Sequence, residues 1–516
     1  GTYFPDKERH GLPAFSKVCK QVAGSYRDRR KEIEKQNTSL MNIISGMDEF
    51  KAVDSTELQA ELLDIAREQL QQQFDEVCGG FGKAPKFPYP TSLERLLRHW
   101  NGNPDDVLAR HMVLYTLECM ALGGMNDQLG GGFCRYSVDE KWMIPHFEKM
   151  LYDNGLLLSL YTEAWLATSN PLYERAVRKT ANWVLREMQS SNGGYYSSLD
   201  ADSEGEEGKF YVWTQKEVQA LLSGEEYRIF AQRYGFDLPA NFKDRWNPHV
   251  HSSIEAIQDN LRVSATEIED HLGSAHKKLF AAREQRNRPN RDDKILVSWN
   301  ALMIKGLAQA ARAFDAIHFQ TSAERCLDFI RQQMWHKGRL FATCKNDHAH
   351  LSAYLDDYIF LIDAILELLQ LRWNSDDMNF ALELAEAVLE HFAAPEGGFY
   401  FTADDHETLI QRPIPLNDDS LPAGNAIAAK VFNRLGHMLG ETRYLDAAEN
   451  TLKAASHAMQ QSPLEHASLL LALEEYLNPV TIIIIRGDLT LQDWKNVLDR
   501  EYRPRQLVFA ITDKCN

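Results

Sequence analysis

A turn of small residues followed by aromatic or apolar residues recurs along this chain between segments with helical periodicity. The five turns are Gly79-Gly80-Phe81-Gly82, Gly130-Gly131-Gly132-Phe133, Gly193-Gly194-Tyr195-Tyr196, Gly338-Arg339-Leu340-Phe341 and Gly397-Gly398-Phe399-Tyr400. Their starts lie 51, 63, 145 and 59 residues apart, so the longest gap can hide one more diverged unit. Helical hairpins repeating every 50 to 70 residues or so favour a closed ring of six hairpins over an open solenoid of shorter repeats. We therefore expect a mainly α protein, an (α/α)6 toroid in which the inner helices' N-terminal ends and their preceding loops converge on one funnel.

Helical periodicity dominates residues 46–478, which we assign to the ring. The clearest predicted helices are residues 58–74, 107–122, 147–166, 173–188, 301–314, 355–371, 381–392, 426–439 and 444–459. Residues 1–45 precede the ring and contain one predicted amphipathic helix, residues 15–33. Residues 479–516 follow it as a small β-α-β appendage, with strands at 480–485 and 506–512 around a helix at 491–498.

Composition excludes several functional classes. The 516 residues carry 56 Lys and Arg against 74 Asp and Glu, a formal charge of −18, and no basic run, so a nucleic-acid partner is not expected. The longest apolar run, residues 480–485, is too short to cross a bilayer, so we expect no membrane partner. The seven cysteines are scattered without a C-x-x-C pair, which indicates a reducing compartment, the cytoplasm. Phosphate-loop, dinucleotide and metalloprotease motifs are absent, so no cofactor or metal site is predicted, and protein partners stay open.

One histidine stands out as a candidate acid or base. Pro145 suits the first turn of a helix, which would place His146 at the helix entrance, facing the funnel. The alternative is a histidine whose hydrogen bonds are satisfied by local backbone or by Glu148. Arg135 and Trp142, in the same segment, are candidate substrate-binding residues.

An acidic loop follows the third turn, with five carboxylates between residues 200 and 207. Its members Asp200 and Asp202 are candidate catalytic residues, because two carboxylates across a cleft can divide acid and base roles in sugar hydrolysis. The alternative is a solvated acidic loop.

Further acidic pairs stand beside aromatic residues. Asp292 and Asp293 precede Trp299 and Asn300, and Asp356 and Asp357 precede Tyr358. Aromatic faces stack on sugar rings while carboxylates bind their hydroxyls, so Asp293 and Asp357 are candidate catalytic residues and the others candidate binding residues. The alternative for one Asp of each pair is a helix N-cap. His251, as a catalytic residue, and Asn425, as a binding residue, complete the candidates.

Five long segments resemble the thioredoxin-domain-containing family typified by spermatogenesis-associated protein 20. They are residues 79–88, 127–154, 196–214, 291–303 and 355–360. The resemblance implies an N-terminal thioredoxin-like domain followed by an (α/α)6 barrel similar to N-acylglucosamine 2-epimerases and six-hairpin glycosidases. It also implies that residues 1–45 are the last part of the thioredoxin-like domain, whose upstream half carries a C-x-x-C pair, and that the appendage is truncated near Cys515.

These features leave three functions open. The first is a sugar epimerase or isomerase that uses His146, with His251, to remove and return a proton beside a carbonyl. The second is a glycosidase that uses two of Asp200, Asp202, Asp292, Asp293, Asp356 and Asp357. The third is a non-catalytic protein that binds a glycan or partner, or assists the thioredoxin-like half. In each case we expect a small carbohydrate as the ligand of the funnel.

Overall fold

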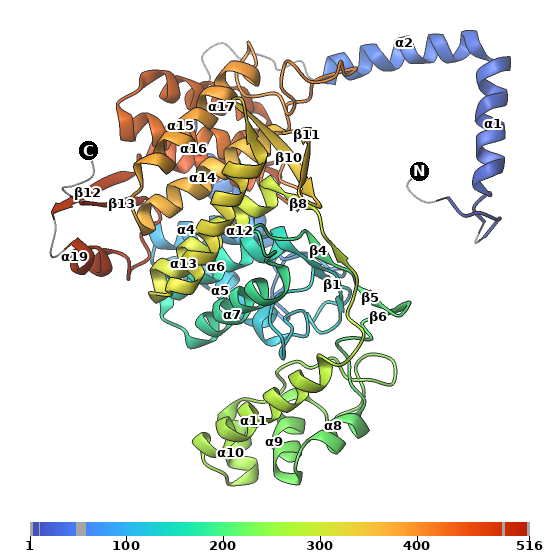
Figure 1. Ribbon diagram of the computed structural model, residues 1–516, viewed down its shortest axis with the longest axis vertical. Coiled ribbons are helices and arrows are strands. Elements are labelled where there is room, and N and C mark those ends of the chain that lie inside the picture. Colours follow the sequence, from blue (N-terminus) through green and yellow to red (C-terminus); the bar gives the residue numbers. More distant parts are fainter. Residues whose placement is uncertain (1–3, 10, 48–57, 488–490, 513–516) are drawn as a thin grey trace.

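A computed structural model describes residues 4–9, 11–47, 58–487 and 491–512 (Figure 1). Its body is a ring of paired helices. The inner helices are α4 (Pro90–Gly102), α6 (Leu151–Thr168), α12 (Val297–Phe314), α14 (Leu355–Leu371), α16 (Gly424–Leu439) and α18 (Ala467–Leu477). The outer helices are α3 (Glu61–Gln73), α5 (Val107–Leu122), α7 (Pro171–Trp183), α13 (Ile317–Phe329), α15 (Ser375–His391) and α17 (Thr442–Gln461). Each inner helix contacts the next one in this order, and α18 contacts α4.

The inner helices are apolar around most of their circumference because neighbours cover them on every side. In α14 all but two of the residues are buried, whereas in α17 the buried residues form one stripe, from Tyr444 to Met459. The predicted boundaries of residues 107–122 and 355–371 coincide with α5 and α14.

A continuous set of buried ion pairs crosses the middle of the ring. Asp363 on α14 accepts hydrogen bonds from Lys430 on α16 at 2.8 Å and pairs with Lys305 on α12 at 2.9 Å. Glu475 on α18 accepts from Arg434 on α16 at 2.6 Å and from Arg98 on α4 at 2.8 Å. Burial alone would raise the pKa of Glu475, but the positive charges of Arg434 and Arg98 lower it to about 2. Five of the six inner helices are thus joined through charges.

Asparagine side chains fasten three of the glycine-aromatic turns to the inner helix that follows. Asn154 on α6 accepts from the backbone N–H of Phe133 at 2.7 Å and donates to its carbonyl at 2.9 Å. Asn300 on α12 does the same with Tyr195, and Asn425 on α16 with Phe399. Each side-chain amide bonds to the backbone N–H and C=O of one turn residue, as a neighbouring strand would, and so satisfies two buried backbone groups.

The longest gap between turns contains an insertion and no sixth repeat. Helices α8 (Gln215–Leu221), α9 (Gly224–Tyr234), α10 (Ile254–Leu261) and α11 (Ala265–Arg283) form the lobe at the bottom of Figure 1 and bury their own apolar core. The sixth inner helix, α18, follows α17 through the short 3-10 turn Pro463–His466. A sixth glycine-aromatic turn is absent there, which explains why the repeat count stopped at five.

Short strands join the loops before the inner helices. β1 (Tyr136–Ser137) pairs with β2 (Pro145–His146), β4 (Ser198–Leu199) lies between β3 (Lys149–Met150) and β7 (Arg291–Asp292), and β5 (Asp202–Ser203) pairs with β6 (Glu206–Glu207). β10 (Arg339–Lys345) pairs with β8 (Ile295–Leu296), β9 (Trp335–His336) and β11 (His348–Ser352). Single π turns, Val184–Met188 and Ile330–Met334, end α7 and α13.

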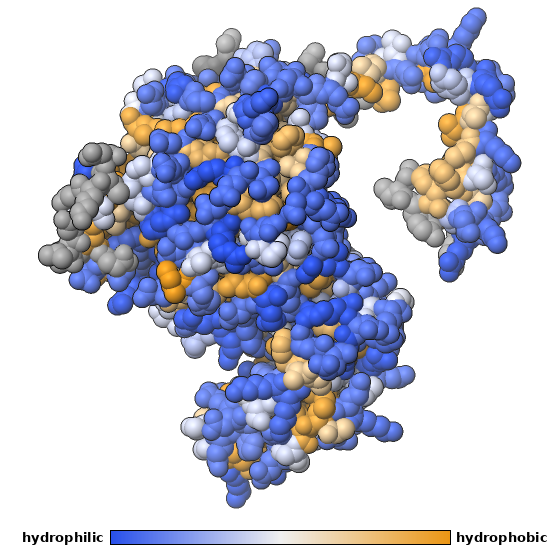
Figure 2. Space-filling model, in the orientation of Figure 1, coloured by the Kyte–Doolittle hydropathy of each residue, from blue (hydrophilic) through white to orange (hydrophobic). Residues whose placement is uncertain are grey.

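The two flanks of the ring differ in how they pack. After the ring, β12 (Thr481–Gly487) pairs in parallel with β13 (Gln506–Thr512), and α19 (Leu491–Leu498) connects them, as predicted. Before it, residues 15–33 form two helices, α1 (Phe15–Asp28) and α2 (Arg30–Met47), because the backbone leaves the helical region at Arg29. Helix α1 buries no residue, and Figure 2 shows apolar patches along this arm. The thioredoxin-like origin of residues 1–45 stays a prediction.

In the part of the chain that the structure describes, no helix is both long and apolar enough to span a membrane.

The ion pairs in the ring predict a strong effect of a single charge. We expect Glu475→Gln to lower the free energy of unfolding by about 3–5 kcal/mol, because Arg434 and Arg98 lose their shared buried counter-charge. Urea unfolding followed by circular dichroism measures this. The control is Glu449→Gln, which removes the partly exposed pair with Lys453 and should leave the midpoint almost unchanged. Equal midpoints for the two variants would contradict a structural role for the ring charges.

Candidate active site

The N-terminal ends of the inner helices lie against one another. The backbone N–H of Ser298 on α12 donates to Asp357 on α14 at 2.9 Å, and the ring of Trp299 on α12 meets Tyr152 on α6 edge-on at 4.7 Å. Between α14 and α16, a side chain on Gly424 would overlap Oδ1 of Asp356. The loops that precede these helices therefore bring their side chains to one end of the ring, as the toroid predicts.

His146 lies at this end of the ring, but in a strand. The prediction that Pro145 starts a helix is wrong: Pro145 and His146 form β2, Met150 is extended, and α6 begins at Leu151. The imidazole Nδ1 lies 2.8 Å from Glu207 of β6, and Nε2 lies 3.6 Å from Glu148. The ring also stacks on Tyr136 at 5.2 Å. His146 is thus oriented by two carboxylates and one aromatic ring.

A polar chain continues from Glu148 towards α6. Arg135 lies 3.7 Å from Glu148 and donates through Nε to the hydroxyl of Tyr152 at 3.2 Å. The next residue, Asp153, is 8% exposed, and its Oδ2 has no hydrogen-bond partner in the structure. Burial raises the pKa of Asp153 well above its ordinary value; Arg135 opposes this rise, and Glu148 adds to it. The burial of Asp153 therefore favours the neutral form of its carboxyl, the form that can donate a proton.

Two more carboxyl groups stand at the start of α14. Asp357 is the third residue of the helix, and its Oδ2 accepts from the backbone N–H of the N-cap residue, Tyr354, at 2.9 Å. It therefore helps to cap the helix, although it is not the N-cap itself. Asp356 has an unpartnered Oδ1. Burial, with a smaller contribution from the neighbouring Asp357, raises the pKa of Asp356 to about 7. Asp356 therefore changes charge near neutral pH.

The acidic-loop candidates lie at the edge of this region. Asp200 and Asp202 are exposed. Asp292 pairs with Lys294 at 2.8 Å and Asp293 with Arg291 at 2.6 Å. These four residues therefore lie towards the surface. Within the acidic loop, the carboxylate that contacts His146 is that of Glu207.

The structure gives other predicted residues packing positions. Trp142 is fully buried and donates to the carbonyl of Cys78 at 3.0 Å, and Tyr358 is fully buried with its hydroxyl bonded to Leu340 N–H. Neither ring has a free face for a sugar. The amides of Asn300 and Asn425 are occupied by the turns described above.

His251 lies in the insertion. It is exposed, its ring is 6.3 Å from that of His249, and none of the contacts found in the described residues joins it to His146. The pairing of His146 with His251 therefore has no geometric support.

Sequence reasoning missed Asp153, Tyr152 and Glu207 as individual site residues. A signal was available for Asp153. The turn is held by Asn154 in α6 and by Tyr358 in α14, so the two helices can be aligned on these residues. In that alignment Asp153 corresponds to Asp357, which was already a candidate. Nothing in the sequence distinguishes Glu207 from its acidic neighbours, because its contact with His146 depends on the β5–β6 hairpin.

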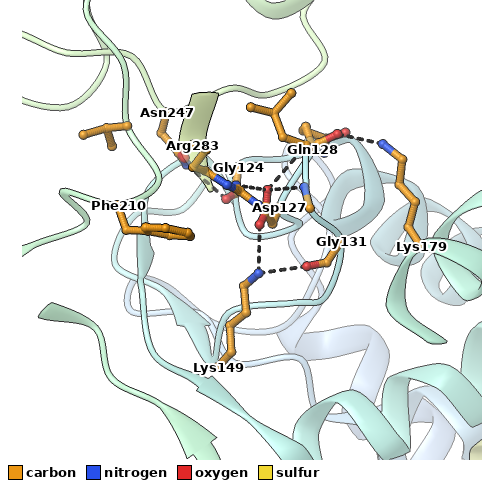
Figure 3. Close-up of polar contacts among 12 residues, drawn as sticks. Gly124, Asp127, Gln128, Gly131, Lys149, Lys179, Phe210, Asn247 and Arg283 are labelled. Carbon is orange, nitrogen blue, oxygen red and sulfur yellow. Dashed lines mark hydrogen bonds and ion pairs between the residues drawn. The ribbon is translucent and has the colours of Figure 1, made fainter. Parts of the chain in front are cut away.

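A buried ion cluster supports the start of α6 (Figure 3). Asp127 accepts from Lys149 of β3 at 2.9 Å and from Arg283 at the end of α11 at 2.8 Å. Burial alone would raise the pKa of Asp127, but Arg283 and Lys149 hold it well below its usual range. Because Lys149 lies two residues before Leu151, the cluster fixes the first turn of α6 and ties the insertion to the ring. The described residues contain no group of three metal-ligating side chains.

Comparison with known proteins identifies relatives along nearly the whole chain, although no protein-family model matches it. Spermatogenesis-associated protein 20 of Mus musculus is 29% identical in an alignment of 544 positions that covers 96% of this chain and 68% of that protein. The Homo sapiens protein is 29% identical over 541 aligned positions, with the same coverage. An uncharacterized Caenorhabditis elegans protein, B0495.5, is 27% identical over 525 aligned positions that cover 95% of this chain and 71% of that protein. The resemblance predicted from the motifs is thereby confirmed.

Solved structures show the fold. Cellobiose 2-epimerase from Bacillus thermoamylovorans B4167 has a TM-score of 0.52 at 9% identity, covering 81% of this chain and 99% of that one. D-mannose isomerase also has a TM-score of 0.52 at 9% identity, covering 83% and 100%. At this identity the likeness concerns architecture, and it confirms the predicted (α/α)6 toroid.

The buried carboxyl of Asp153 predicts that replacing this residue with Asn raises the stability of the protein, by an amount that depends on pH. Because the folded protein disfavours the ionised form of this carboxyl, the contribution of Asp153 to stability falls as the pH rises above about 4, the ordinary pKa of an unfolded Asp. Asp153→Asn cannot ionise, so we expect it to be more stable than wild type at pH 8 and to lose this advantage at pH 4.5. Thermal unfolding at both values measures the difference, with the exposed Asp200→Asn as control. An effect of Asp153→Asn that is the same at both values would refute the assignment.

Proposed function

We propose that this homologue of spermatogenesis-associated protein 20 is a sugar epimerase or isomerase whose active site is the N-terminal end of the ring. The observation that carries the proposal is the buried, unpartnered carboxyl of Asp153. It follows Tyr152 in α6, and Tyr152 is joined to His146 through Arg135 and Glu148. A buried acid without a partner is costly unless a ligand supplies the missing hydrogen bond.

The residues divide naturally into proton-transfer roles. His146 removes the proton from the sugar carbon beside the carbonyl, while Asp153 donates a proton to the carbonyl oxygen, which gives a neutral enediol. Solvent water then supplies a proton to the opposite face of that carbon, the enol proton goes back to Asp153, and His146 releases its proton to solvent, which gives the epimer. If His146 instead returns its proton to the neighbouring carbon, and the other enol hydroxyl gives its proton to Asp153, the product is the isomer. Glu207 lies 2.8 Å from the imidazole Nδ1 and orients the ring.

The remaining polar groups would hold the substrate. Arg135 presents a guanidinium that is 36% exposed and therefore accessible to a sugar oxygen. Trp299 is half-buried and meets Tyr152 edge-on, which leaves a face on which a sugar ring can stack. The names of the two enzymes with the same architecture, cellobiose 2-epimerase and D-mannose isomerase, support a sugar as the substrate class.

Deuterium exchange tests this function. The protein is incubated in D2O with free monosaccharides, N-acetylated sugars and disaccharides, and proton NMR follows the sugar signals. We expect deuterium at C2 together with a new epimer or isomer. His146→Gln and Asp153→Asn should each lower the rate by about 100-fold or more, the usual contribution of a general acid or base. Asp293→Asn, which removes an exposed carboxylate paired with Arg291, is the matched control and should retain full rate.

Other results of the same experiment would indicate a glycosidase or a binding protein. New reducing-end signals without deuterium at C2 would indicate glycoside hydrolysis and transfer the catalytic roles to carboxyl groups such as Asp153 and Asp356. Saturable sugar binding without any reaction would indicate a binding protein. Either result would overturn the epimerase proposal.

A further inference from the structure

A polar cavity lies outside the ring, where α5 and α7 meet the insertion. Its volume is about 300 Å³. Arg175 and Lys179 of α7 line it on one side, and Arg233 of α9 and His276 of α11 on the other. Its apolar lining includes Leu122, Leu172, Ile254 and Leu272. The cavity thus combines an apolar surface with charges from two separately packed parts of the chain.

The three cations of this cavity lack carboxylate partners. Lys179 donates to the backbone carbonyl of Gln128 at 2.7 Å (Figure 3), and Arg233 donates to the backbone carbonyl of Ser252. Across the described part of the chain, no ion pair is formed by Arg175, Lys179 or Arg233. The one carboxylate in the lining, Glu269, is exposed.

The cations also repel one another. Burial lowers the pKa of Lys179 to about 8; Arg175, Arg233 and Arg283 act in the same direction, and Asp127 opposes them. Burial likewise lowers the pKa of His276 to about 3, with contributions from Lys179, Arg233 and Arg175. The local field is therefore positive, and it attracts an anion.

An unpartnered amide gives independent evidence of a ligand. Asn126, which lines the cavity, is 4% exposed. Its Nδ2 donates to the carbonyl of Ala121 at 2.9 Å, but its Oδ1 has no partner in the structure. A buried amide oxygen is normally satisfied, so this atom indicates a hydrogen-bond donor on the occupant.

We infer that this cavity binds a small hydroxylated oxyanion, a sugar or polyol that carries a phosphate or a carboxylate. The anionic group lies among Arg175, Lys179 and Arg233, and a hydroxyl donates to Oδ1 of Asn126. The site is separate from the proposed active site, because its lining contains none of His146, Arg135, Tyr152 or Asp153. Its occupant bridges α7 of the ring and α9 of the insertion, so it stabilises the junction between them.

Calorimetric titration of the whole chain tests this site with four probes: inorganic phosphate, glucose 6-phosphate, gluconate and uncharged glucose. We expect glucose 6-phosphate or gluconate to bind, and the comparison distinguishes a phosphate from a carboxylate. Arg175→Gln and Lys179→Gln should each weaken the binding by about tenfold or more, because each removes a charge-assisted contact. Arg175 is exposed and makes no described hydrogen bond or ion pair, so its replacement leaves the fold intact.

Two controls keep this result independent of catalysis. Arg178→Gln changes the same helix and the same charge, but Arg178 pairs with Glu174 and does not line the cavity, so binding should be unchanged. His146→Gln should also bind the anion normally, even where it abolishes deuterium exchange. The inference is overturned if neither anionic sugar binds, if glucose binds equally well, or if the Arg175 and Lys179 variants bind like wild type.

Discussion

The charges buried inside the ring determine how the six helix pairs are arranged. Asp363 and Glu475 each take their partners from neighbouring inner helices, so neither carboxylate can be satisfied within its own helix. Removing any of the five inner helices that carry these charges would leave charge uncompensated in a region of low dielectric, which is far more costly than losing an apolar contact. The network therefore favours one order of helices, and the glycine-aromatic turns can hold the functional side chains at one end of a fixed frame.

Periodicity predicts this frame well where a helix is either fully buried or cleanly amphipathic. Residues 107–122 and 355–371 match α5 and α14 because their apolar pattern runs from the first residue to the last. Pro145 illustrates the limit. Its fixed φ suits a helix start and also an extended segment, and the choice depends on the pairing of β2 with β1, a tertiary contact that spacing does not reveal. The insertion was equally hidden, because its helices have the same period as those of the ring.

The candidate site shows a different limit, because the same types of side chain serve packing and the proposed proton transfer. Asn300 and Asn425 are polar residues at the starts of inner helices, as a sugar site requires, yet their amides hold turns. The recurrence of Asn154 in the same role would have favoured the structural interpretation. Asp153 is the reverse case: an acidic residue in a helix start predicts a cap, whereas its value as an acid comes from burial without a partner.

The loop around Asp127 connects the proposed active site with the anion cavity. The Asp127 carboxylate binds Lys149, just before α6, while the carbonyl of the next residue, Gln128, accepts one hydrogen bond from Lys179. A lysine ammonium has three donors, so Lys179 keeps two for an occupant without releasing the loop. Contact through a shared loop is not by itself energetic coupling, which requires two arrangements of the loop with different affinities. Because Asp127 is bonded to Lys149, Arg283 and two backbone N–H groups, the loop has one strongly preferred arrangement. We therefore expect a bound anion to stabilise the active site and not to switch it between two arrangements.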